Sequence, residues 1–377
     1  MIPLARRTLL HDWPRFLPSI LAVGFSGVLL AVQVALVLGI FGSAAIPVTA
    51  STADLWAGYP GTQSVNFGRT VGPDVEMRLR AHPQVQDVEP YLWLEADWQA
   101  REGAAGSVPV FVSGIRTSPG AMLFAHALVP GLRAALDEPG AVVVDRSDLR
   151  QLGTPLGGWA WVNGRRVHLI AAIDGLRALG GVNVLASLET ARTLGAPSRA
   201  DGATYYVARL VAGADAKSVR RDFSPLPAIG AHEVWTAAQF ARRSQLYWMF
   251  DTGAGVAVLF MALIVCVVGV VITSQSLTVV VASSSREYAT LNALGASMSA
   301  LGRVVVEQAC WIGGIGLVLA VLGSTVLLAA ASSYSVPVAM TPEAALACAA
   351  AVLVLALLSG AAALRGLLSA DPASLLR

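Results

Sequence analysis

The sequence predicts a membrane protein with four transmembrane helices and a large α+β extracytoplasmic domain between the first and second helices. Two observations lead to this fold class. Hydrophobic residues make up 55% of the 377 residues and charged residues only 13%, whereas charged residues account for about 25% of an ordinary soluble protein. In addition, four long apolar runs surround a polar middle segment that has turn signals and short β-like runs.

Each apolar run is long enough to cross about 30 Å of hydrocarbon as a helix. The runs cover residues 16–40, 253–272, 309–331 and 344–364. The fourth has a clear helix start, because Thr341 can cap it and Pro342 and Glu343 suit the first helical turn. The first run could instead be a signal peptide, but its apolar core exceeds the roughly 7–15 residues of such a segment.

Arginines in the short flanking segments predict the orientation. They precede the first run, lie between the second and third runs and follow the fourth run, whereas the connector between the third and fourth runs has none. The positive-inside rule then places both termini and the loop at 274–302 in the cytoplasm. We therefore expect cytoplasmic segments at 1–15, 274–302 and 365–377, transmembrane helices at 16–42, 249–273, 303–332 and 343–364, and an outer α+β domain at 43–248.

The outer domain is expected to mix short strands with short helices. β-rich runs at 107–116, 140–146, 158–173 and 203–210 read as strands, and Asn163-Gly164 within the third run is a strong hairpin signal. Segments 71–83 and 147–153 read as helices, the second ended by Gly153. Segment 236–250 predicts a helix that runs without a break into the second apolar run, with Tyr247, Trp248 and Phe250 at the membrane interface.

The sequence offers little that could carry out catalysis or bind a metal or a cofactor. His82, His126, His168 and His232 are scattered without metal-ligand spacing, and the three cysteines all fall in apolar runs. Lys217 is the only lysine, and Ala216 precedes it where a phosphate-binding loop requires glycine. The net charge of +2 does not suggest a nucleic-acid partner. We therefore expect no bound cofactor or metal and no ATP hydrolysis by this chain alone.

Two polar features near the predicted membrane remain as functional candidates. Glu307, early in the third run, is a carboxylate within a membrane segment. Its structural alternative is a pair with Arg303 one turn away or contact with water at the interface.

The connector 284–302 carries apolar residues at spacings of three and four, which predicts one face of a helix. This face consists of Tyr288, Leu291, Leu294, Met298, Leu301 and Val305.

A short, nearly neutral helix of this kind fits docking onto a soluble partner. The alternative is an interfacial helix on lipid headgroups, but such helices are usually rich in Lys and Arg, and residues 284–295 contain only Arg286 as a cation. The string "REYATLNALGAS" followed by "GRVVVEQA", together with the ending "DPASLLR", resembles FtsX-like (MacB/FtsX superfamily) ABC transporter permeases. The stretches "VVVDRSDLRQLG", "WVNGRRVHLIAAI" and "SQLYWMFDTGAGVAV" are similar to the DevC-type subgroup.

The resemblance implies a permease that works as a dimer, with itself or with a paired paralogue, in the inner membrane of a bacterium. It implies a separate ATPase subunit that holds ATP and Mg²⁺, a periplasmic membrane-fusion adaptor and an outer-membrane duct for amphipathic or lipid-like cargo. The positions that match the family string, and that would couple the permease to the ATPase, are Arg286, Glu287, Leu291, Leu294 and Gly295, together with Tyr288 on the same helix. Alternatives within the family are a signal relay that controls a periplasmic hydrolase or a stress response, and a lipoprotein-release permease.

Overall fold

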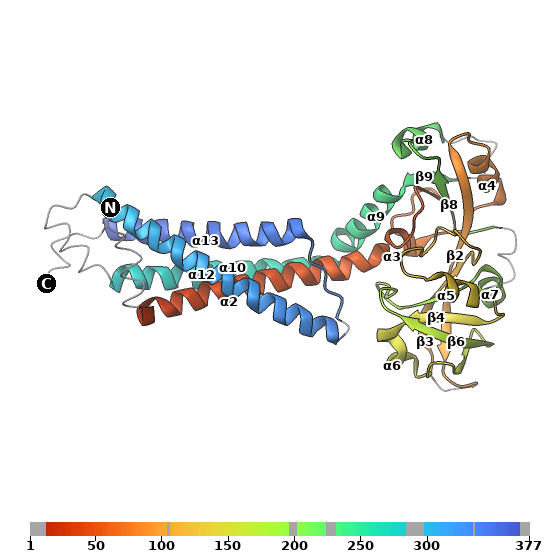
Figure 1. The fold of residues 1–377 in the computed structure, drawn as a ribbon, viewed down its shortest axis with the longest axis horizontal. Coiled ribbons are helices and arrows are strands. Elements are labelled where there is room, and N and C mark those ends of the chain that lie inside the picture. The colour runs from red at the N-terminus through yellow and green to blue at the C-terminus, as the bar shows by residue number, and fades with distance from the viewer. Residues whose placement is uncertain are drawn as a thin grey trace. The chain divides into compact units, whose positions relative to one another are not determined.

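The computed structural model describes residues 13–103, 106–195, 202–223, 231–283, 298–334 and 336–369. The chain divides into a helical unit, residues 1–39 with 256–377, and a mixed α/β unit, Ile40–Gly255. Figure 1 shows long helices in the first unit and a sheet with short helices in the second. Each unit has its own core.

Four long helices build the helical unit. They are α2 (Trp13–Gly42), α10 (Gly253–Ser283), α12 (Met298–Ser333) and α13 (Pro342–Ser369). Among the described residues, three helical stretches are long and apolar enough to cross a membrane: Phe16–Thr49, Gly253–Ile272 and Glu307–Ser333. The apolar stretch of α13, Pro342–Leu358, is shorter, so the total of four spans stays a prediction.

Both helices that flank the predicted cytoplasmic loop extend beyond their expected ends. The loop was expected at 274–302, but α10 continues to Ser283 and α12 already begins at Met298. The expected boundary followed the drop in hydrophobicity at Ser274-Gln275-Ser276. Residues 274–283 contain no Gly or Pro, so the backbone hydrogen bonds of α10 continue through these polar residues.

The α/β unit is built on nine strands in the order β3-β7-β4-β6-β5-β2-β8-β1-β9. Because β2 also pairs with β3, six of these strands, β2, β3, β7, β4, β6 and β5, close into a ring. The strands are β1 (Leu55–Gly58), β2 (Val85–Gln99), β3 (Val108–Ile115), β4 (Ala141–Asp145), β5 (Trp159–Val162), β6 (Arg165–Ile173), β7 (Val182–Ser187), β8 (Tyr205–Leu210) and β9 (Glu233–Thr236).

The long strand β2 joins the two parts of the sheet. Its first half, from Val85 to Tyr91, pairs with β8, and its second half, from Leu92 to Trp98, pairs with β3. Buried apolar side chains pack on both faces of the sheet, one cluster centred on strands such as β4 and β7 and another on aromatic residues around Trp56, Tyr91 and Tyr205. The sequence did not predict β2.

Short helices cover the sheet and connect its strands. They are α3 (Ile46–Thr49), α4 (Pro73–Arg80), α5 (Pro130–Ala135), α6 (Leu149–Leu152), α7 (Leu188–Leu194), α8 (Ala216–Asp222) and α9 (Ala237–Leu246), with the 3₁₀ turns η1 (Ser43–Ala45), η2 (Val65–Phe67) and η3 (Arg146–Asp148). Thr236 and Gln239 form a capping box at the start of α9, which satisfies two backbone donors there.

Several predicted turns and caps are present at the expected residues. Asn163 and Gly164 both have positive φ, 49° and 75°, as a two-residue hairpin turn between β5 and β6 requires. Gly153 ends α6 in the left-handed conformation. The side chain of Thr341 accepts a hydrogen bond from the amide of Ala344, 3.2 Å away, and so caps α13.

Candidate functional site

The predicted coupling residues lie outside the described residues. Arg286, Glu287, Tyr288, Leu291, Leu294 and Gly295 all fall in the gap between the end of α10 at Ser283 and the start of α12 at Met298. Glu307 is described and lies on α12 with an exposed side chain. The coupling role of these residues stays a prediction, and the structure describes the helices on either side of the gap.

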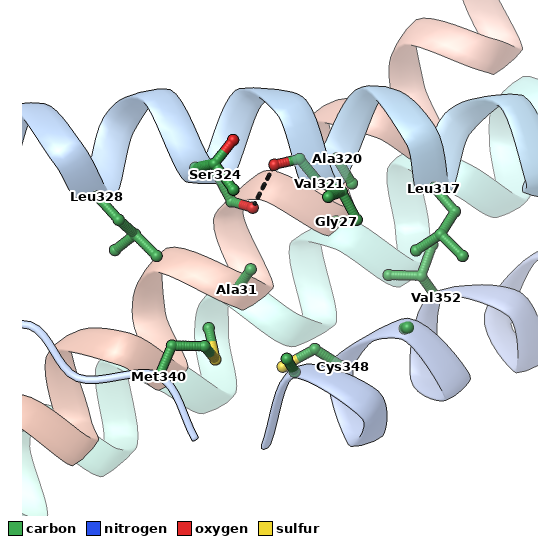
Figure 2. A pocket seen from close by; sticks show the side chains of 13 residues that line it. Gly27, Ala31, Leu317, Ala320, Val321, Ser324, Leu328, Met340, Cys348 and Val352 are labelled. Carbon is green, nitrogen blue, oxygen red and sulfur yellow. Dashed lines mark hydrogen bonds between the residues drawn. The ribbon is translucent and has the colours of Figure 1, made fainter. Parts of the chain in front are cut away.

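Glycines allow α2 to approach α12 and α13 closely. A Cβ atom on Gly27 would lie 2.6 Å from the Cβ of Ala320 on α12 and 3.2 Å from a methyl group of Val352 on α13 (Figure 2). Likewise, a Cβ atom on Gly316 of α12 would lie 2.6 Å from a methyl group of Val23. Small residues of this kind are what close packing of helices in a membrane requires. A Cβ atom on Gly24 would likewise lie 3.1 Å from the Cβ of Leu319 on α12, whereas one on Gly314 would meet nothing within 4 Å.

The connector between α12 and α13 is hydrogen-bonded to α2. The amide of Ala339 donates to the carbonyl of Ala35, 3.0 Å away. Nearby, Gly39 packs so closely on the connector that a Cβ atom there would lie 2.2 Å from the carbonyl oxygen of Pro337. The connector between α12 and α13 is therefore held directly against the last turns of α2, which ends at Gly42.

The segment that precedes α10 contains a break that the sequence did not predict. After α9 the chain forms a π-helix, η5 (Tyr247–Asp251), and Thr252 is then extended, with φ −100° and ψ 141°. The expected continuous helix from the domain into α10 is therefore wrong. The hydroxyl of Thr252 donates to the carbonyl of Trp248 and accepts from the amide of Gly255, at 2.7 and 3.2 Å, so its side chain satisfies both broken ends.

Aromatic contacts fix the π-helix to the α/β unit. The ring of Trp248 stacks on Phe67 of η2, with centroids 5.8 Å apart, and its indole nitrogen donates to the hydroxyl of Ser64 at 3.1 Å. Tyr247 meets Phe67 edge-on, with centroids 5.5 Å apart. π-Helices of a single turn occur frequently at functional sites. In the sequence this site is marked by the aromatic cluster of Tyr247, Trp248 and Phe250, which by itself predicts a membrane-interface belt.

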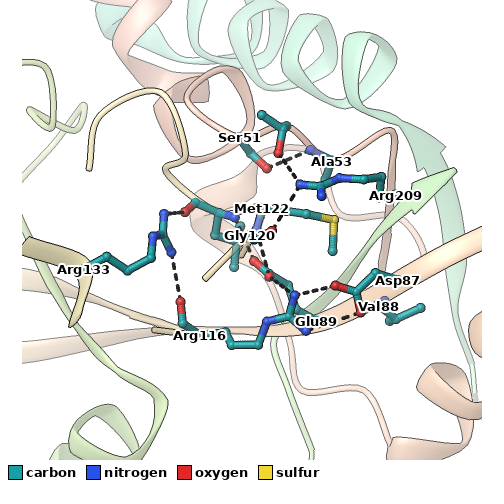
Figure 3. A network of polar contacts seen from close by, with 12 residues as sticks. Ser51, Ala53, Asp87, Val88, Glu89, Arg116, Gly120, Met122, Arg133 and Arg209 are labelled. Atoms are coloured by element: carbon teal, nitrogen blue, oxygen red, sulfur yellow. Dashed lines mark hydrogen bonds and ion pairs between the residues drawn. The ribbon is translucent and has the colours of Figure 1, made fainter. Parts of the chain in front are cut away.

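A buried charge network joins β2 to the segment that follows β3 (Figure 3). The fully buried carboxylate of Glu89 accepts hydrogen bonds from the amides of Met122 and Leu123, at 2.9 and 2.7 Å, and lies 3.2 Å from the guanidinium of Arg116. Burial raises the pKa of the Glu89 carboxyl, and these amides and Arg116 oppose the rise. Arg116 also hydrogen-bonds Asp87, which holds the pKa of that carboxyl below its usual range.

The same network fixes the far side of this segment. Arg133 of α5 donates to the carbonyls of Arg116, at 2.9 Å, and Leu123. Arg209 of β8 donates to the hydroxyl of Thr52 at 2.8 Å. The network joins carboxylates, guanidinium groups and backbone amides, and it therefore holds the 116–133 segment against β2.

No metal-binding arrangement is present among the residues that the structure describes, because no three His, Cys, Asp or Glu side chains converge. The histidines remain apart. His82 lies 3.4 Å from Asp222, His168 lies 3.4 Å from Glu138, and His232 lies 2.8 Å from Arg78.

One comparison with known protein families finds a match in the C-terminal helices. Residues 258–372 match the family model described as FtsX-like permease C-terminal. No curated protein matches the chain.

Two solved structures are similar to part of the chain. The periplasmic region of MacB from Actinobacillus actinomycetemcomitans is 13% identical, with a TM-score of 0.35, over 52% of this chain and 94% of that one. The extracellular domain of the noncanonic ABC-type transporter YknZ from Gram-positive bacteria is 12% identical, with a TM-score of 0.33, over 49% of this chain and 100% of that one. At these TM-scores the similarity defines neither the fold nor the function of this chain.

Residues 258–372, which include most of α10 and all of α12 and α13, are therefore similar to the C-terminal part of an FtsX-like permease. The long apolar helices of the described residues, three of which are long and apolar enough to cross a membrane, agree with this similarity.

Proposed function

We propose that this chain is the permease subunit of an ATP-driven exporter and that it couples hydrolysis in a separate ATPase subunit to motion of its α/β domain. The observation that carries the proposal is the family match over 258–372. This range contains the apolar face of Tyr288, Leu291 and Leu294, most of α10 before it and all of α12 after it. The coupling helix would dock on the ATPase through this face, on the cytoplasmic side.

The packing of the helical unit supports a route for the motion. Movement of the ATPase would shift α12 and α13, and the connector between them is bonded to α2 through Ala339 and Ala35. The chain passes from α2 directly into η1, which packs against α9 within the α/β unit. The two segments through which the chain enters and leaves the α/β unit, η1 and α9, are therefore in contact with each other. A displacement of one would reach the other.

The finer features of the proposal rest on the sequence resemblance to DevC-type permeases. They are an outer domain on the periplasmic side of a bacterial inner membrane, termini in the cytoplasm, a permease dimer, and an adaptor with an outer-membrane duct for amphipathic cargo. ATP and Mg²⁺ would be held by the partner subunit.

Affinity purification of the tagged chain from native membranes, with crosslinking and identification of the retained proteins, tests this function. An ATPase recovered together with a periplasmic adaptor is the expected result. An ATPase with a periplasmic hydrolase and no adaptor would replace the exporter by a signal relay. An ATPase with a second, different permease chain and no adaptor would favour lipoprotein release. Recovery of no ATPase would contradict all three.

A further inference from the structure

Large apolar side chains remain exposed where η2 meets η5 in the α/β unit. Phe67 of η2 is 47% exposed and Phe250 of η5 is 57% exposed. Phe67 touches the rings of Tyr247 and Trp248, and Leu246, one turn before Phe250, is also exposed. These five residues form one surface, which we call the η2–η5 patch. Isolated surface hydrophobics are ordinary, whereas a contiguous group of this kind marks an interaction site.

The patch lies beside the start of a candidate membrane span. The stretch Gly253–Ile272 is long and apolar enough to cross a membrane, so the chain enters the hydrocarbon near Gly253. The hydroxyl of Thr252 bonds the carbonyl of Trp248 at 2.7 Å and the amide of Gly255 at 3.2 Å. Only these two hydrogen bonds separate Trp248 from the first turn of the span. The ring of Phe67, stacked on Trp248, therefore lies close to the same level.

The preceding candidate span ends at the same side of the α/β unit. The apolar stretch Phe16–Thr49 includes η1 (Ser43–Ala45), and η1 packs against both η2 and α9. The turn η2 is thus in contact with the end of one span and with the segment that leads into the next. The headgroup layer of a bilayer adds about 5–8 Å on each side of the hydrocarbon. A bilayer crossed by both spans would bring this layer to the patch.

The charges around the patch are compatible with lipid headgroups. Arg242 is exposed on α9, and Arg69 is exposed just after η2, with its guanidinium 5.2 Å from the ring centroid of Tyr59. Asp251 is exposed as well and offsets one of these cations. Aromatic rings at the level of the headgroups are typical of proteins at a membrane interface. Because the charges nearly balance, the contact would depend mainly on the rings.

We propose that the η2–η5 patch binds the phospholipid headgroup layer, and that Phe67 makes η2 a lipid contact of the α/β unit itself. The occupant is a lipid surface because both candidate spans adjoin the patch. The stack of Phe67 on Trp248 would then join the α/β unit, the π-helix and the bilayer surface in one contact. The proposal rests on the membrane location of the spans and is independent of the ATP-driven function.

Photocrosslinking of the full chain in phospholipid nanodiscs tests the contact. Phe67→p-benzoylphenylalanine should form a phospholipid adduct with a yield within about threefold of that from the same change at Phe260, an exposed ring inside the candidate span. The same change at Met77, an exposed residue of α4, should yield about tenfold less. A lipid adduct at Phe260 but not at Phe67 would overturn the proposal. An adduct of Phe67 with a second copy of the chain in place of lipid would do the same.

Hydrogen exchange of the unmodified chain gives a second measurement that leaves the stack of Phe67 and Trp248 intact. Amides 68–70, which follow η2, should exchange about threefold or more slowly in nanodiscs than in amphipol without lipid, because the headgroup layer limits their contact with water. The exposed turn at 118–120 is the control and should exchange equally in the two media. Equal exchange of amides 68–70 in the two media would contradict the lipid contact.

Discussion

Glu89 is the residue on which the buried network of the α/β unit depends. Its carboxylate is fully buried, and it accepts from two backbone amides and faces Arg116. A buried carboxylate is stable only when such donors compensate for the loss of water. Sequence patterns could not reveal this, since Glu89 precedes a proline in a stretch of β2 with several other acids.

Replacing Glu89 by Gln should destabilise the α/β unit by about 2–4 kcal/mol. The amide would turn its own donor toward a backbone N–H and leave Arg116 without its buried counter-charge. Thermal unfolding of the full chain in detergent, followed by tryptophan fluorescence, measures the change. Glu95→Gln, an exposed position on the same strand, is the matched control and should leave the transition unaltered. Equal transitions for the two variants would contradict the role of Glu89.

The buried carboxyl group of Asp148 should make the free energy of unfolding depend on pH. Burial, helped by the nearby carboxylate of Asp145, raises its pKa to about 6, and one of its oxygens is buried without a hydrogen-bond partner. The folded form therefore binds this proton more tightly than the unfolded form, whose pKa is about 3.9. The contribution of Asp148 to the free energy of unfolding should fall as pH rises from about 4 to about 6 and stay low above that.

Between pH 4 and pH 6 the contribution of Asp148 to the free energy of unfolding should fall by roughly 2–3 kcal/mol, because each pKa unit corresponds to about 1.4 kcal/mol. Denaturation of the Asp148→Asn variant between pH 4 and pH 8 should lack this fall relative to the unmodified chain. Asp174→Asn, at an exposed acid, should keep it. If the three proteins shared one pH profile, Asp148 would not titrate in this way.

At the scale of elements, the break between η5 and α10 makes opposite predictions for two neighbouring glycines. A Cβ atom on Gly255 would lie 2.1 Å from the carbonyl oxygen of Trp248, whereas a Cβ atom on Gly253 would meet nothing within 4 Å. Gly253→Ala should be neutral or stabilising by up to about 1 kcal/mol, since alanine favours a helix. Gly255→Ala should displace the π-helix and destabilise its contacts.

Hydrogen exchange of the amides around η5 measures both effects. Faster exchange at Tyr247 and Trp248 is expected in Gly255→Ala and not in Gly253→Ala. Similar exchange in the two variants would mean that the close approach of Gly255 to η5 does not hold this segment in place.

Elements with local signals could be predicted from the sequence, and elements defined by distant contacts could not. Asn163-Gly164 and Thr341 encode a turn and a helix cap within a few residues, and both are present. Strand β2 has no such signal, because its two halves pair with different neighbours and Pro90 lies within the first half. The π-helix before Thr252 is bonded to the α/β unit through Trp248 and Ser64, two residues far apart in the sequence.

At the scale of the whole molecule, the sequence predicted the class of protein better than its site. The apolar runs and the family string indicated a permease, and the match over 258–372 agrees. The coupling residues stay a prediction from the resemblance to the family string, and helical periodicity adds an apolar face but not its partner. The segment between α12 and α13 is hydrogen-bonded to α2 through the backbones of Ala339 and Ala35, and nothing in these two side chains marks them in the sequence.

Reporter fusions test the membrane topology. A reporter fused after Arg377 should read cytoplasmic, and one inserted near Gly181, in the loop before β7, should read extracytoplasmic. These expectations follow from the distribution of arginines around the apolar runs. Two reporters on the same side of the membrane would overturn the arrangement of four spans.

The ATPase rate of the assembled complex tests coupling most directly. Leu291→Glu and Leu294→Glu place a charge on the apolar face of the connector, whereas Asn292→Glu places one off that face. The account predicts that both leucine variants insert normally but reduce the rate to that of the ATPase subunit alone, while Asn292→Glu retains stimulation. Full stimulation in the leucine variants would contradict the coupling role of this face.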